Sequence, residues 1–254
     1  MTASGTNSAS VKSATALRDG LRRAVIDERD GPLPAMLVAL TVLAGVVDAA
    51  SILRLGGVFV ATITGNIVFV GLGIAGSREF AIGTCLFAIG GFVAGALVGA
   101  AVIRRGPQHR GRVIRDVLHV KLALAAVTTA IAIAAGNYPD APLRNAMVVL
   151  LAMSMGDQLA AIRYLKVPDL VTVVLTLTVT GVVADRRQLG WSHPAMLRRF
   201  TAVLAFALGA VSGGALVLYV SLGAALAFGL AIIVGVTIAT HLVANSPAGW
   251  TAPR

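Results

Sequence analysis

Long apolar segments dominate the chain and alternate with short polar stretches. A helix needs about 20 mostly apolar residues to cross the hydrocarbon core of a bilayer. Six segments reach that length, whereas 57–75 is marginal, 169–184 is short, and both are rich in Gly or Thr. The pattern predicts an all-α polytopic membrane bundle with six spanning helices. The eight segments are 34–53, 57–75, 80–103, 117–136, 142–162, 169–184, 200–219 and 222–243.

Polar tails flank the apolar part of the chain. Residues 1–33 are Ser/Thr-rich and then charged, and we expect a cytoplasmic tail. Leu17, Leu21 and Val25 recur at the spacing of one helix face, which is compatible with a short amphipathic surface helix, but the polar composition favours the other interpretation. That interpretation is a partly disordered tail. A short C-terminal tail, 244–254, follows the last apolar segment.

The basic residues decide which segments cross the membrane. If all eight segments cross, the arginine-rich loop 104–116 and the loop 162–168 face outside. If 57–75 and 169–184 instead enter and return, both loops and both tails face the cytoplasm. Only Arg54, Arg78 and Arg144 then lie outside, and Lys121 lies within a span. The positive-inside rule favours this second arrangement, with re-entrant or broken segments at the two exceptions.

The chain contains an internal repeat, which divides it into 34–136 and 142–243. FAIGGFVAGALV at 87–98 matches FALGAVSGGALV at 206–217 without gaps, and TITG at 62–65 matches TVTG at 178–181. Chance similarity between Ala/Gly-rich sequences is the alternative. Each half holds three spans, an odd number, so the second half must run in the opposite sense. Such inverted repeats with discontinuous segments recur in secondary transporters.

Composition supports the membrane interpretation. The chain is 57% hydrophobic and 13% charged, and its mean hydropathy is +0.87. Soluble domains carry about 25% charged residues. The net charge of +10 suits basic loops against anionic lipid headgroups. We expect no nucleic-acid partner, because no basic recognition helix or stacking aromatic motif accompanies that charge.

Two acids and a glutamine inside predicted spans are candidates for function. A carboxylate inside a membrane costs a few kcal/mol, and such acids commonly serve function. Asp48 is therefore a candidate proton or cation site, and the alternative is a carboxyl that caps a neighbouring helix. Asp157 and Gln158 lie in the corresponding helix of the second half, near the position that aligns with Asp48. Together they could line a solute or ion pathway.

The two Thr/Gly-rich segments are candidate breaks. Where a helix breaks inside a membrane, the freed backbone groups need partners, and Thr and Asn side chains supply them while Gly relaxes the backbone. Helix ends aimed into a cavity can then bind an ion or polar solute. The alternative is Thr back-bonding within a bent helix. The candidate residues are Thr62, Thr64, Gly65 and Asn66 in the first half and Thr176, Thr178, Thr180 and Gly181 in the second.

The remaining polar and small residues indicate structure. Lys121 lies near a helix end, where its stem could snorkel to the surface. The glycines at 91, 95 and 99 form a stripe that suits internal helix packing more than a dimer face. The four histidines show no metal-ligand spacing. Nucleotide-binding and hydrolase motifs are absent, so we expect no enzyme, cofactor or metal centre.

The motifs in their order resemble the YoaK-like family of bacterial multi-pass membrane proteins, a family of unknown function. The matching residues are Gly45, Asp48 and Ala49; Phe59, Ala61, Thr64, Gly65 and Asn66; Gly156, Gln158 and Ala160; and Thr178, Thr180 and Gly181. Leu159 departs from the pattern, where the family usually has Asn. The resemblance covers roughly 35–240 and implies a multi-pass inner-membrane protein without a defined substrate.

These observations predict an inner-membrane permease of a small solute or ion, with proton coupling as one option and Asp48 as the coupling acid. Both termini would face the cytoplasm, and a homodimer would suit so small a transporter. The alternative is a non-transporting scaffold or accessory subunit, in which the polar groups only join helices. An intramembrane enzyme is a remote third, because no nucleophile with an acid–base pair is visible.

Overall fold

The fold is described from a computed structural model that covers residues 30–105, 109–167, 175–185 and 193–243. Eight helices form these ranges, and six of them are long and apolar enough to cross a membrane. The chain is therefore a polytopic helical membrane bundle, as predicted. The helices are α2 (Leu33–Arg54), α3 (Ile63–Ile74), α4 (Ile82–Arg105), α5 (Arg110–Ala135), α6 (Ala141–Leu165), α7 (Leu175–Ala184), α9 (Pro194–Tyr219) and α10 (Leu222–Val243).

Two spans begin earlier than hydropathy predicted. Helix α5 begins at Arg110 rather than 117, and α9 begins at Pro194 rather than 200. Helix α5 begins with Arg110, Arg112 and Arg115, and α9 carries Arg198 and Arg199 one turn after its start, so a hydropathy window detects only the later, more apolar part of each helix. The ring nitrogen of His109 accepts a hydrogen bond from the backbone N–H of Arg112 and caps α5. His193 caps α9 in the same way. The predicted tails, 1–29 and 244–254, lie outside the described residues.

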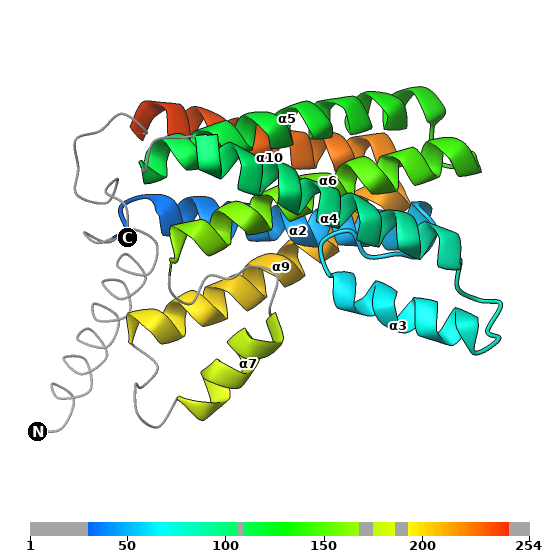
Figure 1. The fold of residues 1–254 in the computed structure, drawn as a ribbon, viewed down its shortest axis with the longest axis horizontal. Helices are drawn as coiled ribbons and strands as arrows, with labels where there is room; N and C mark the ends of the chain where they lie inside the picture. The colour runs from blue at the N-terminus through cyan, green and yellow to red at the C-terminus, as the bar shows by residue number, and fades with distance from the viewer. Residues whose placement is uncertain (1–29, 106–108, 168–174, 186–192, 244–254) are drawn as a thin grey trace, which may run out of the picture.

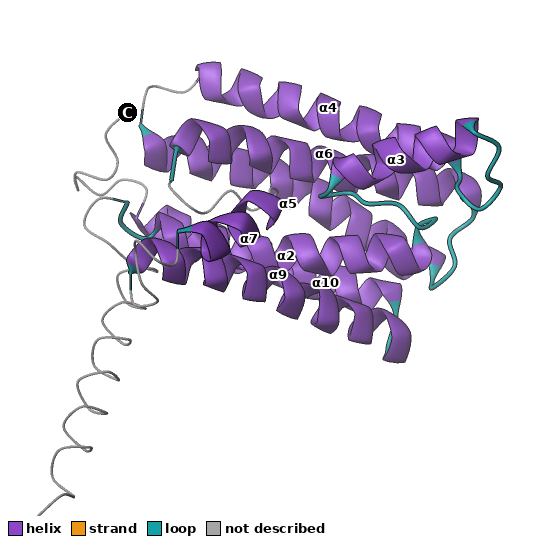
Figure 2. Cartoon of the chain, turned by 90° about the horizontal axis from the view of Figure 1, so that it is seen from below, coloured by secondary structure: helices purple, strands orange, loops and turns teal. Residues whose placement is uncertain are grey.

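The six long helices lie side by side and share two ends (Figures 1 and 2). We call the end on the left in Figure 1 the basic end. Helices α2, α5 and α9 begin there, and α4, α6 and α10 end there. The helix termini at that end carry Arg104, Arg105, Arg110, Arg112, Arg115, Arg163, Lys166, Arg198 and Arg199. Arg54 and Arg144 lie at termini of the opposite end.

The two short helices do not cross the bundle. After α2 ends, residues 55–62 turn back into the bundle without forming a helix, and α3 then runs out to the end where α4 begins (Figure 1). Helix α7 runs to the basic end, where α9 begins (Figure 1). The stretch before it, 168–174, lies outside the described residues. The predicted helical segment 57–75 is thus helical only from Ile63, because its first residues form the break.

Helices α2 and α9 are in close contact at glycines. A Cβ atom at Gly45 would lie 2.2 Å from the carbonyl oxygen of Phe206, and one at Gly209 would lie 2.0 Å from that of Val42. Real Cβ atoms do not approach so closely, so the backbones touch here only because both residues lack a side chain. This is the small-residue packing that joins helices in membranes.

Helices α4 and α6 repeat this contact with other residues. A Cβ at Gly156 would lie 2.0 Å from the carbonyl oxygen of Phe92, and one at Gly95 would lie 1.9 Å from that of Met153. The glycine stripe on α4 is therefore internal packing, as predicted, because Gly91 and Gly99 also contact α6.

The two contacts differ in register from the predicted internal repeat. Gly156 occupies the place of Gly45, Gly95 that of Gly209, and Phe92 that of Phe206. The gapless match had instead paired Phe87 with Phe206, five residues away. The packing pairs FVAGALVGAAVI (92–103) with FALGAVSGGALV (206–217). Because both segments are rich in Ala and Gly, their sequences can be aligned in several registers, whereas the backbone contacts fit one of them.

Candidate functional site

The carboxylate of Asp48 joins α2 to the non-helical segment before α3. Its Oδ1 accepts hydrogen bonds from the backbone N–H groups of Val60, at 2.9 Å, and Ala61, at 2.7 Å. Its Oδ2 accepts one from the hydroxyl of Thr62. Asp48 is 3% exposed, so three donors replace the water that it has lost. A buried carboxylate with this number of partners is satisfied.

Asn66 and Ser51 pair with the same segment. The side-chain amide of Asn66 donates to the carbonyl of Phe59 at 2.6 Å and accepts from the N–H of Phe59 at 2.9 Å. The hydroxyl of Ser51 donates to the carbonyl of Val58 at 2.6 Å. Broken backbone inside a membrane must find such partners, since hydrocarbon offers none.

Gly65 and Thr64 lie at the start of α3, directly after the first break. A Cβ at Gly65 would lie 2.6 Å from the ring of Phe59, so the ring can pack there only because Gly65 has no side chain. Thr64 is exposed on the surface of α3. The structure therefore brings Asp48, Thr62 and Asn66 into one clamp, which we call the break clamp, and leaves Thr64 outside it.

The second break lies only partly within the described residues. Thr178 is buried, whereas Thr180 is exposed. A Cβ at Gly181 would lie 2.6 Å from the guanidinium of Arg199, which pairs with Asp185 at 2.5 Å. The side chain of Thr176 lies outside the described residues. These residues cover α9 near the basic end, so in the described part of the chain the two breaks lie at opposite ends of the bundle (Figure 1).

A second polar cluster joins α5 to α6. Lys121 is 0% exposed, and its ammonium donates to the carbonyl of Ser154, at 3.0 Å, and to its hydroxyl, at 2.9 Å. The sequence interpretation placed the ammonium at the surface, and that interpretation is wrong. The side chain of Lys121 packs against α6 and is hydrogen-bonded to Ser154, so its ammonium is held between the two helices and does not reach the surface.

Asp157 and Gln158 lie beside this lysine, one turn further along α6. Asp157 is 0% exposed, and neither carboxylate oxygen accepts a hydrogen bond from a described residue. The side-chain oxygen of Gln158 is likewise buried without a described partner. The charges of Asp157 and Lys121 interact electrostatically. We call Lys121, Ser154, Asp157 and Gln158 the α5–α6 cluster.

Two small cavities adjoin the α5–α6 cluster. One, of about 10 Å³, is lined by Lys121 and Gln158 together with apolar residues of α2, α5 and α6. The other, also of about 10 Å³, is lined by Ser154, Thr129 and apolar residues of α2, α5, α6 and α10. Each volume corresponds to about one water molecule. Of the hydrogen-bonded pair, Lys121 thus lines one water-sized space and Ser154 lines the other.

A buried ion pair adjoins Leu165, one of the residues that line the first cavity. The guanidinium of Arg110 donates to Asp30, at 3.1 Å, and to the carbonyl of Leu165, at 2.6 Å. Asp30 and Arg110 are 0% and 1% exposed. Leu165 also lines the cavity. This pair could not be recognised in the sequence, because Arg110 is one of several basic residues in a predicted loop and Asp30 belongs to the predicted tail.

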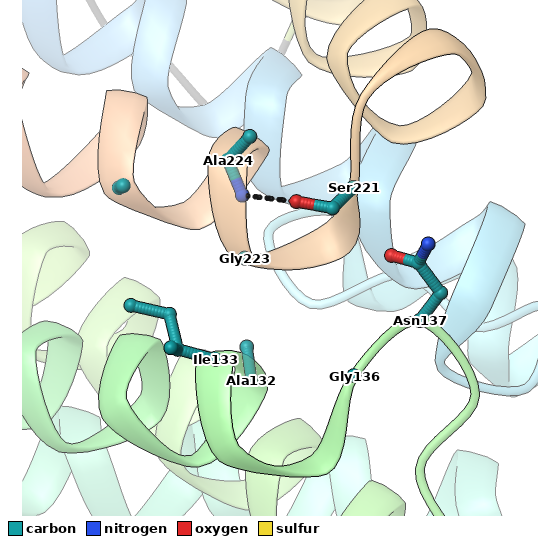
Figure 3. A pocket seen from close by; sticks show the side chains of 8 residues that line it. Ala132, Ile133, Gly136, Asn137, Ser221, Gly223 and Ala224 are labelled. Atoms are coloured by element: carbon teal, nitrogen blue, oxygen red, sulfur yellow. Dashed lines mark hydrogen bonds between the residues drawn. The ribbon is translucent and has the colours of Figure 1, made fainter.

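A larger pocket lies elsewhere. It measures about 350 Å³ and lies between the ends of α5 and α10 that are opposite the basic end (Figure 3). Small and apolar residues line most of it, such as Ala132, Gly136 and Ala224. The polar residues there serve the backbone, since Asn137 accepts from the N–H of Leu222 and Ser221 from that of Ala224. It contains no member of the break clamp or the α5–α6 cluster.

The predicted site residues therefore form two groups rather than one. Asp48, Thr62 and Asn66 hold the first break, whereas Asp157 and Gln158 join Lys121 and Ser154. The two small cavities are lined by the second group and by no residue of the first. Sequence reasoning missed Lys121 as a member of the site, although an intramembrane lysine is itself a recognised signal.

Comparisons with known proteins agree with the architecture. A family model described as protein of unknown function (DUF1275) matches residues 36–239. The chain is 29% identical over 150 residues to the UPF0700 transmembrane protein YoaK of Bacillus subtilis (strain 168). That match covers 59% of this chain and 65% of the relative. No solved structure matches the chain. Because the family model spans most of the bundle, this chain belongs to the DUF1275 family of membrane proteins, to which no function is assigned.

Proposed function

We propose that this chain is a transporter of the inner membrane that moves a small solute or ion, with its coupling charges at Lys121 and Asp157. The observation that carries the proposal is the Asp157 carboxylate, which is buried within a span and has no described hydrogen-bond partner. A carboxylate placed inside a membrane is costly, and such groups commonly mark ion or proton pathways. The nearby ammonium of Lys121 offsets part of that cost.

The chemistry of the cluster suits a proton or a small cation. Three acceptor atoms, two on Asp157 and one on Gln158, lack donors among the described residues. Lys121 is held by Ser154 rather than by the carboxylate itself. A proton or cation that binds Asp157 would weaken its attraction to Lys121, and this change could alter the packing of α5 on α6. Such a change in packing is what couples binding to movement.

The orientation follows from the basic end. Nine basic residues at described helix termini lie there, against two at termini of the opposite end. By the positive-inside rule the basic end faces the cytoplasm, so both termini are cytoplasmic. Anionic headgroups are the partners that this charge favours.

The arrangement of the two halves supports alternating access. Helices α2 and α6 run in opposite directions, and the α2–α9 and α4–α6 contacts match glycine for glycine (Figure 1). We interpret this as an inverted repeat, the design in which one half rocks against the other. The pair of Asp30 and Arg110 would close the cytoplasmic side of the cluster in this conformation. A homodimer is compatible with this arrangement.

In this proposal the role of Asp48 changes. Its three hydrogen bonds fit a carboxyl that holds the break, so Asp48, Thr62 and Asn66 position α3 rather than carry the coupling ion.

A non-transporting scaffold is the second candidate, and the satisfied break clamp favours it. Every hydrogen-bonding group of the Asp48 carboxylate is engaged, and the cavities beside the α5–α6 cluster hold about one water each. In that case the polar residues only join helices.

Currents across a supported membrane distinguish the two candidates. The full-length protein would be reconstituted in liposomes and challenged with panels of inorganic cations, amino acids and organic anions at several pH values. A transporter gives a transient current with at least one solute, and Asp157→Asn abolishes it. Asp140→Asn, at the exposed cap of α6, is the matched control and leaves the current unchanged. Absence of any Asp157-dependent current across the panels would favour the scaffold.

A further inference from the structure

Two histidines from distant parts of the chain meet near the basic end. His119 on α5 and His241 on α10 are separated by 122 residues, and their Nε2 atoms lie 3.0 Å apart. The ring centroids are 5.0 Å apart and the rings cross at 68°. Both side chains are exposed. The proposed transport site contains neither residue.

The separation of the two nitrogens fits a shared metal ion. Metal–imidazole bonds are about 2.0–2.1 Å long. For an ion bound to both Nε2 atoms, the angle N–metal–N would therefore be about 95°. This is close to the 90° of square-planar or octahedral geometry and smaller than the tetrahedral angle that zinc prefers. Tetragonal coordination by nitrogen and oxygen is typical of Cu²⁺ and Ni²⁺.

The surroundings define what kind of site this would be. In the described ranges no group of three or more His, Cys, Asp or Glu side chains could hold a metal. Two imidazoles would therefore be the protein ligands, and water would complete the coordination. Exposure lets an ion enter and leave, and the affinity order of divalent metals places Cu²⁺ above Ni²⁺. The sequence-based expectation of no metal rested on spacing along the chain, which cannot reveal two helices meeting.

We propose that His119 and His241 form a two-histidine site for a tetragonal divalent metal, Cu²⁺ foremost, that ties α5 to α10. Helix α5 belongs to the first half of the chain and α10 to the second, so the bound ion links the halves near the basic end. This proposal is independent of transport, since it depends on neither Lys121 nor Asp157.

Copper binding to the purified full-length protein tests this proposal. The protein would carry an affinity tag without histidine, and calorimetry with Cu²⁺ would be paired with electron paramagnetic resonance. We expect one strong site per chain with a signal from two nitrogen ligands. His119→Asn and His241→Asn each weaken it by at least about tenfold, since loss of even an outer-shell partner commonly costs 10- to 100-fold. His109→Asn and His193→Asn are matched controls at helix caps and leave it unchanged.

A second measurement needs no variant. Diethyl pyrocarbonate modifies exposed imidazoles, and mass spectrometry locates the modified residues. Bound Cu²⁺ should protect His119 and His241 while His109 and His193 stay reactive. Equal protection of all four histidines, or equal Cu²⁺ affinity in wild type and the double variant, would overturn the proposal and leave only the hydrogen bond between the two rings.

Discussion

The ammonium of Lys121 on α5 donates two hydrogen bonds to Ser154 on α6, one to its carbonyl at 3.0 Å and one to its hydroxyl at 2.9 Å. This anchor is buried within two spanning helices, and it holds the positive charge beside Asp157 rather than in direct contact with it. The arrangement separates a structural role, which Ser154 serves, from an electrostatic one, which Asp157 serves. The two roles can be tested separately.

Removing Lys121 should destabilise the bundle, and removing Asp157 as well should restore it. Lys121→Met leaves the Asp157 carboxylate buried without a countercharge, which costs about 3–5 kcal/mol. In Lys121→Met with Asp157→Asn, no charge remains in the α5–α6 cluster, so the free energy of unfolding returns to within about 1 kcal/mol of wild type. Denaturant-induced unfolding in detergent micelles measures both.

Lys166→Met is the matched control for this series. Lys166 is an exposed residue beyond the end of α6, so its loss should change the free energy of unfolding by less than about 0.5 kcal/mol. If the double variant were as unstable as Lys121→Met, the electrostatic interaction of Lys121 with Asp157 would not be what stabilises the cluster.

Asp48 should act through the hydrogen bonds that it accepts. Asp48→Ala leaves the buried N–H groups of Val60 and Ala61 without an acceptor, and each such loss costs about 1–3 kcal/mol. Asp48→Asn keeps an oxygen for these donors and should lose much less stability. The same unfolding measurement compares the two variants. Equal losses in both would mean that the charge, and not the hydrogen bonds, holds the break.

Much of this architecture could be predicted from the sequence, because the lengths of the apolar segments and the charges of the loops determine how the chain inserts into a bilayer. The count of spans follows from the lengths of the apolar segments. The break before α3 follows from Thr62, Gly65 and Asn66, which are the residue types that freed backbone requires.

Other features could not be predicted because they depend on how distant helices meet. The gapless repeat match misplaced the partner of Phe206 by five residues. Segments rich in small apolar residues can be aligned in several registers, and the sequence does not show which glycines contact a neighbouring backbone. The burial of Lys121 depends on α5 packing against Ser154 of α6, and hydropathy does not reveal which helices pack together. The Arg110–Asp30 pair joins residues 80 positions apart and leaves no local pattern.

The two close helix contacts should respond alike to alanine. In Gly95→Ala the new Cβ would meet the Met153 carbonyl at 1.9 Å, and in Gly209→Ala it would meet the Val42 carbonyl at 2.0 Å. The helices must separate, at a cost of about 1–3 kcal/mol or more in each variant. Melting temperatures in detergent measure the loss.

Gly90→Ala and Gly235→Ala are the matched controls on α4 and α10, because nothing lies within 4 Å of a Cβ at either position. They should leave stability unchanged or raise it slightly, since alanine favours a helix over glycine. A loss in Gly90→Ala as large as that in Gly95→Ala would show that helix propensity, not contact, governs these positions.

The Arg110–Asp30 pair should limit access to the α5–α6 cluster. A single cysteine at the cavity wall, Ala161→Cys in a Cys85→Ser background, should react slowly with a membrane-impermeant maleimide in inverted vesicles. Arg110→Gln breaks the pair and should speed labelling about tenfold, which corresponds to about 1.4 kcal/mol of easier opening. Arg112→Gln, exposed in the same turn, should leave the rate unchanged.

Topology gives the most direct test of the re-entrant segments. Reporter fusions at Gln108 and Gln188 should both report the cytoplasm, because neither α3 nor α7 crosses the bundle and the positive-inside rule places the basic end there. Fusions at Ser77 and Asn137, beyond α3 and α5, should report the periplasm. If α3 crossed, Gln108 would move outside and carry its neighbouring arginines with it. A periplasmic signal at Gln108 or Gln188 would therefore refute the six-span arrangement together with the antiparallel halves that depend on it.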